Sequence, residues 1–96
     1  MEQVMTTAIS DEAKRRARWR AEHRGTREAD MLVGGFAQRW LPVMTAEEFA
    51  WFEALMQEQD VDIMAWAFGR TQPPAALEGP MMERLRALDY LQLTPR

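Results

Sequence analysis

The sequence predicts an all-α fold, a small bundle of about five short helices. β-Branched residues are few, and no segment alternates apolar and polar residues as a half-buried strand would. Helix-forming residues dominate, and glycines and prolines divide the chain into short stretches. The 96 residues are 47% apolar and 28% charged, which is typical of one globular domain. We therefore expect a single domain over residues 1–96, with frayed ends at 1–9 and 92–96.

The first helix is expected to begin after Ser10, whose hydroxyl is suited to an N-cap. Asp11 and Glu12 follow in the first turn, where the positive end of the helix dipole favours acids. Gly25 is the expected stop, one residue beyond the helix, where glycine adopts a left-handed backbone without steric cost.

The second helix is expected to run from Thr26–Glu28 to Leu41, ahead of Pro42. Its centre contains Gly34 and Gly35. Each glycine inside a helix costs roughly 1 kcal/mol relative to alanine. We expect a compensating feature, either a close helix crossing or a kink.

The last three helices have clear start signals. A capping box joins Thr45 and Glu48 at the start of the third helix. Asp60 or Asp62 is expected to cap the fourth helix, which contains the segment DVDIMAWAFG and ends at Gly69. The fifth helix follows a Pro-Pro loop and begins at Gly79-Pro80.

Apolar residues recur at helical spacing in these segments and define the expected core. The fourth helix should turn Met64, Ala67 and Phe68 to one apolar side. Across the chain, the side chains expected to be largely buried are Phe36, Phe52, Leu55, Trp66 and Leu85.

Charge is unevenly distributed, although the net charge is only −3. Residues 14–27 contain seven basic side chains and one acid, whereas residues 40–69 contain six acids and no Lys or Arg. Such asymmetry bears on partners rather than on fold. No apolar run is long enough to cross a bilayer and no leader peptide is recognisable, so we expect a cytoplasmic protein.

No residue pattern indicates catalysis, a metal site or a bound cofactor. Cysteine is absent, and the one histidine, His23, has no nucleophile or acid beside it. A solvated polar role is the simpler interpretation of His23. Asp60 and Asp62 are better explained as helix caps than as an acid–base pair. We therefore expect a protein that is not an enzyme.

Two clusters are candidates for binding. Arg16, Arg20 and Arg24 are spaced by four residues and would share one helical face. That face is either simply solvated or a surface for an anionic partner such as nucleic acid, although the acidic balance of the chain argues against nucleic acid.

The second cluster is a charged corner at HRGTREAD, residues 23–30. Arg24 offers a planar donor fork, Gly25 permits close backbone approach, and Glu28 could orient an arginine. Arg20 and Asp30 flank these residues. The competing interpretation is helix capping with local ion pairs of about 0–1 kcal/mol.

At these residues the chain resembles a known family. Arg24, Gly25 and Glu28 match the Arg-Gly-x-x-Glu signature of the succinate dehydrogenase flavinylation factors, the SdhE family, which is related to a mitochondrial succinate dehydrogenase assembly factor. A second segment is similar to the family's Asp-x-Asp-Leu-x-x-Trp-x-x-Gly pattern, at Asp60, Asp62, Ile63, Trp66 and Gly69. Trp19 before the signature, the capping box and MMERL at 81–85 extend the resemblance over residues 12–90.

The resemblance implies an assembly factor that binds the flavoprotein subunit of succinate dehydrogenase, or of fumarate reductase, and promotes the covalent attachment of FAD to that subunit. Separately, we expect the chain to be a monomer. The factor has no cofactor of its own and acts on the FAD of its partner. The implied contact residues are Arg24, Gly25 and Glu28, with Arg20 and Asp30 beside them. Neither membrane insertion nor nucleic-acid binding is expected. Ala29 stands where the family often has leucine, and the pair Gly34-Gly35 is not part of its pattern.

Overall fold

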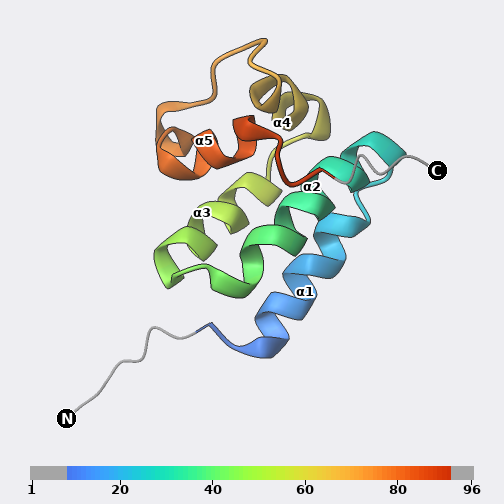
Figure 1. Ribbon diagram of the computed structural model, residues 1–96, viewed down its shortest axis with the longest axis vertical. Coiled ribbons are helices and arrows are strands. Elements are labelled where there is room, and N and C mark those ends of the chain that lie inside the picture. Colours follow the sequence, from blue (N-terminus) through green and yellow to red (C-terminus); the bar gives the residue numbers. More distant parts are fainter. Residues whose placement is uncertain (1–8, 92–96) are drawn as a thin grey trace.

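The computed structural model describes residues 9–91, and in this range it contains only helices and connecting segments. Figure 1 shows their arrangement, and the expected all-α bundle is confirmed. The expectation of frayed ends at 1–8 and 92–96 lies outside the described residues. The elements are α1 (Asp11–Glu22), α2 (Arg27–Trp40), the short 3-10 helix η1 (Leu41–Val43), α3 (Ala46–Met56), α4 (Asp60–Ala67), the short 3-10 helix η2 (Ala75–Leu77) and α5 (Pro80–Ala87).

The bundle has two parts. α1 and α2 lie side by side and antiparallel, and α3 lies along the other side of α2 (Figure 1). α4 and α5 pack against each other across the end of this group, joined by the loop that contains η2. The turn between α1 and α2 is thereby brought close to the start of α4, because α2 also contacts α4.

Three helices begin with side-chain caps, and those at Ser10 and Thr45 are the ones that the sequence predicts. The Ser10 hydroxyl accepts a hydrogen bond from the Ala13 amide at 3.0 Å, and the Thr26 hydroxyl accepts one from Ala29 at 3.2 Å. Thr45 and Glu48 form both hydrogen bonds of a capping box. Local side-chain chemistry therefore sets where these helices start.

Two predicted helix boundaries are corrected, the end of α1 and the start of α4. α1 ends at Glu22 with His23 as its C-cap, so Gly25 lies two residues beyond the cap rather than one. α4 is capped by Gln59 without a side-chain hydrogen bond, and Asp60 is its first residue. Asp60 does not cap the helix because its carboxylate is engaged by an arginine from another part of the chain.

The glycine pair is explained by close approach. A Cβ atom on Gly34 would lie 3.0 Å from Cγ and 3.3 Å from Cα of Glu22, so a larger residue would require Glu22 to shift, whereas glycine lets α2 approach α1 this closely without a shift. A Cβ atom on Gly35 would lie 3.4 Å from the Tyr90 carbonyl oxygen. We expected either a close helix crossing or a kink at the glycine pair, and the structure shows a close crossing at Gly34. The helix is continuous through both glycines.

The core matches the predicted set. The exposed fraction is 0% for Phe36, Phe52, Leu55 and Leu85 and 6% for Trp66. The apolar side of α4 differs from the expected one, because its buried residues are Ile63, Trp66 and Ala67, whereas Phe68 is 41% exposed. Ile9, which was expected to fray, packs partly buried against the core.

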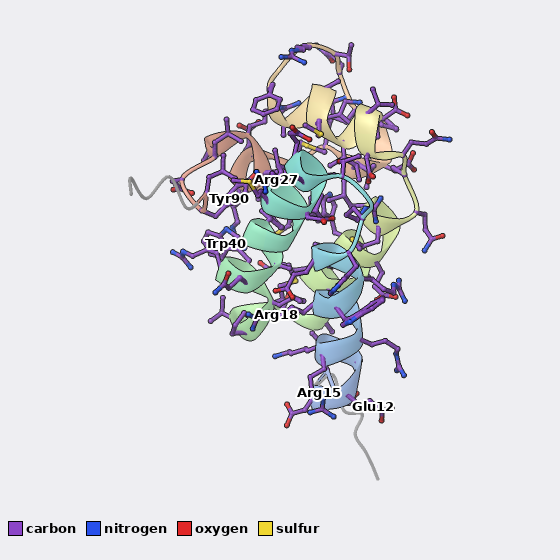
Figure 2. All side chains as sticks on the ribbon, turned by 90° about the vertical axis from the view of Figure 1, so that its right-hand side faces the viewer. Glu12, Arg15, Arg18, Arg27, Trp40 and Tyr90 are labelled. Carbon is purple, nitrogen blue, oxygen red and sulfur yellow. The ribbon has the colours of Figure 1, made fainter. Side chains whose placement is uncertain are left out.

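Tyr90 closes the core from the segment after α5, at the edge of the face shown in Figure 2. Its hydroxyl donates to the Leu85 carbonyl at 2.8 Å and its ring meets Phe36 edge-on. Burial raises the pKa of the Tyr90 phenol, and the nearby Asp89 raises it further.

Among the helices described, none combines the length and the apolar character needed to cross a membrane.

Candidate functional site

The turn between α1 and α2 is held by Asp30, from the first turn of α2. One carboxylate oxygen, Oδ1, accepts the backbone N–H groups of Arg24 at 2.5 Å and Gly25 at 3.2 Å. Two successive N–H groups on one charged acceptor fix the path of the turn. Asp30 was predicted as a contact residue, and the structure shows that its carboxylate already has a structural role.

Arg24 points into the molecule rather than into solvent. Its side chain is 13% exposed, and its Nε donates to Oδ1 of Asp60 at 2.6 Å. One terminal nitrogen donates to the Met56 carbonyl at 3.2 Å and the other to the Glu58 carbonyl at 2.9 Å. The guanidinium thus ties the α1–α2 turn to the α3–α4 turn, using carbonyls that the end of α3 leaves without helical partners.

This geometry corrects one expectation about Arg24. It does not extend the row of Arg16 and Arg20, because α1 ends before it. Its guanidinium instead joins two turns separated by more than thirty residues. Asp60 is therefore a site residue that sequence reasoning missed. Its signal was present in the Asp-x-Asp segment, which we assigned to helix capping.

Gly25 and Glu28 form the exposed part of the corner. Gly25 has a φ of +124°, and no atom lies within 4 Å of the position that its Cβ would occupy. Glu28 lies in the first turn of α2 with its side chain exposed. Among the residues described, it forms no hydrogen bond or ion pair, so it does not orient Arg24 as we considered; Asp60 does. We define Gly25 and Glu28 as the exposed corner.

An aromatic pair lies beside the corner, on the last turns of α1. Trp19 is 60% exposed and stacks on His23, with ring centroids 4.1 Å apart. The His23 Nδ1 atom is 2.7 Å from the Trp19 carbonyl oxygen. His23 is exposed, in agreement with a solvated role. Arg20 lies in the last turn of α1 with a partly buried side chain.

The basic face of α1 is partly neutralised within the chain. Arg16 pairs with Glu12 at 3.4 Å and Arg18 with Glu22 at 2.8 Å. Figure 2 places Arg15 and Arg18 along α1, and Arg27 at the far end where α2 begins. The basic side chains are therefore spread along the helix rather than gathered around the corner.

The arrangement is chemically suited to binding. In residues 9–91, no cluster of three His, Asp or Glu side chains is placed to hold a metal ion. What the corner offers is a backbone of fixed geometry, an open glycine and one exposed carboxylate, held by charged hydrogen bonds beneath. Such a preformed surface loses little conformational freedom when a partner docks.

Fold and corner together define the class, a small helical protein in which hydrogen bonds within the chain hold the α1–α2 turn in place. The chain matches the family described as flavinator of succinate dehydrogenase over residues 15–89, and it belongs to that family. The match includes the corner, Asp60 and the whole of α2 to α5.

Individual relatives agree with this assignment. The chain is 40% identical over 72 residues to the FAD assembly factor SdhE of Acetobacter pasteurianus, a match that covers 75% of this chain and 66% of that protein. It is 39% identical over 79 residues to the mitochondrial succinate dehydrogenase assembly factor 2 of Cryptococcus neoformans, covering 79% of this chain and 45% of that protein. The chain thus spans less than two thirds of the length of these relatives.

Proposed function

We propose that this chain is an assembly factor that binds the flavoprotein subunit of succinate dehydrogenase, or of fumarate reductase, and promotes covalent attachment of FAD to it. The family is described as a flavinator of succinate dehydrogenase and the relatives are named as assembly factors, which supports this role. In this proposal the flavoprotein performs the chemistry. The factor is not an enzyme and holds no cofactor of its own.

One observation carries the proposal: the family signature divides into an anchored half and an exposed half. Arg24 is committed to Asp60 and to two backbone carbonyls. Gly25 and Glu28 have no such role within the described residues and face solvent. A charged residue without a partner, displayed on a braced turn, contributes little to folding and is well placed for recognition.

The exposed corner supports a mechanism based on differential binding. A factor promotes a reaction within its partner if it binds the competent conformation of that partner more tightly than the others. Because the corner is braced before docking, its contacts favour one arrangement of the partner. Gly25 lets a partner segment approach the backbone, and Glu28 meets a donor or cation on that segment.

The alternative was a nucleic-acid-binding or antitoxin-like module that uses the arginine-rich first helix. Two arginines of that helix are paired with glutamates, and family membership gives this alternative no support. The expectations of a monomer and of a cytoplasmic location remain predictions.

Reconstitution tests the proposal. Purified flavoprotein subunit without covalent flavin is incubated with FAD, with and without this protein, and covalent flavin is followed by in-gel fluorescence. We expect the protein to accelerate flavinylation. Glu28→Gln should lower that acceleration, whereas Glu47→Gln should not. Glu47 is a matched control, since both residues are exposed and second in a helix capped by threonine. Equal flavinylation with and without the protein would exclude the proposed role.

A further inference from the structure

An apolar groove lies next to the exposed corner. Residues of α2, of α4 and its C-cap, and of the segment after α5 line it. Met31 and Phe68 are 48% and 41% exposed there, and both line the same groove, so they form part of one continuous apolar surface rather than isolated exposed side chains. The lining residues are Glu28, Met31, Leu32, Met64, Phe68 and Leu91.

The groove is continuous with the corner. Asp60 and Met64 are spaced by four residues and so share one face of α4, and Phe68, the C-cap residue, follows four residues later. Asp60 binds Arg24 at the corner, while Met64 and Phe68 line the groove. Glu28 belongs to both, as part of the exposed corner and as the charged residue of the groove lining. A partner seated on the corner would therefore reach the groove without crossing another element.

We propose that this groove docks a segment of the flavoprotein subunit that presents an apolar side chain with a lysine or arginine beside it. The inference rests on the proposed function and names the chemistry of the docking segment. Apolar walls select the apolar side chain, and the methionines adapt to its shape. Glu28, which has no ion-pair partner among the described residues, selects the neighbouring cation.

A second copy of this chain is the competing occupant. Trp19 is 60% exposed and lies between Arg18 and Arg20, so it also combines an apolar group with cations. Trp19 and the groove are different surfaces, so such a contact would be made either head-to-tail or twice across a two-fold axis. It would also cover the exposed corner. The flavoprotein is therefore the favoured occupant.

The test measures binding of the full chain to purified flavoprotein subunit by isothermal titration calorimetry. Met31→Asp should raise the Kd roughly tenfold or more, because it replaces a central apolar contact by a carboxylate. Val43→Asp is the matched control, because Val43 is 63% exposed outside the groove, and its Kd should change by less than about twofold. Phe68→Gln should act as Met31→Asp does, and circular dichroism confirms that each variant is folded.

Each outcome decides the inference. If wild type binds the flavoprotein and both groove variants bind equally well, the groove is not the docking site, although the proposed function stands. If wild type does not bind at all, both proposals fail. If the groove variants lose only self-association in light scattering, and Trp19→Ser does the same, the occupant is a second copy and the inference is overturned.

Discussion

The two halves of the α1–α2 corner differ in what their residues contact. Arg24 and Asp30 point inward, where they bond to Asp60, to two carbonyls and to the backbone of the turn itself. Gly25 and Glu28 point outward and contact little of their own chain. Residues that are neighbours in one short signature thus serve different purposes.

The difference teaches that a family signature need not be a list of contact residues. A docking surface needs residues that touch the partner and residues that hold these in place. In this corner Arg24 bonds within its own chain, and it would belong to the second group if the corner is the docking surface that we propose. Mutations in the two halves should therefore separate stability from binding, and the following predictions test that separation from the largest expected effect on stability to the smallest.

The largest loss of stability is expected from a core residue. Trp66 is 6% exposed in the centre of α4, and truncation of a buried tryptophan leaves a large cavity. Trp66→Ala should lower the free energy of unfolding by about 3–5 kcal/mol. Urea denaturation followed by circular dichroism measures this. A loss comparable to that of a surface residue would show that α4 is not packed as described, and the anchoring of Arg24 would then be in doubt.

Arg24→Ala should cost about 1–3 kcal/mol of unfolding free energy, because it leaves Asp60 and two carbonyls without their donor. Arg18→Ala is the matched control. Arg18 also bonds a carboxylate through Nε, at 2.8 Å, but its side chain is 49% exposed. An exposed pair contributes about 0–1 kcal/mol. If the two variants lose the same stability in urea denaturation, the inward half of the corner is not an anchor.

Gly25→Ala should cost about 1–2 kcal/mol, since its φ of +124° disfavours any side chain although space is available. Gly79→Ala provides the comparison, because Gly79 has a φ of +135° and equally open surroundings away from the corner. Thermal melting should show similar losses for both. Only Gly25→Ala should also reduce flavinylation of the partner, and an equal reduction by Gly79→Ala would point to stability alone.

Glu28→Gln should change the unfolding free energy by less than about 0.5 kcal/mol, because Glu28 is exposed and has no ion pair within the described residues. Its Kd for the flavoprotein subunit, measured by titration calorimetry, should nevertheless rise, and the salt dependence of binding should weaken. A clear loss of stability with unchanged Kd would reverse the roles that we assign to the two halves.

The helices and the core were predictable because their causes are local. Ser10, Thr26 and Thr45 lie within three residues of the amides that they cap, and apolar residues at helical spacing mark one face of each helix. The corner was also chosen as the candidate site from its residue pattern, and its role in binding stays a prediction. By itself the sequence therefore determined the fold class, most helix boundaries, five buried side chains and the position of the candidate site.

Only the tertiary structure decided which way each corner residue faces. Arg24 meets Asp60 across 36 positions of sequence, and Gly34 accommodates Glu22 from another helix. The groove likewise needs Met31 and Phe68 from different helices. Such pairings depend on how the helices pack, which spacing along one helix does not encode. The same arginine could have been solvated or buried, and the deciding factor was the presence of a carboxylate and two free carbonyls within its reach.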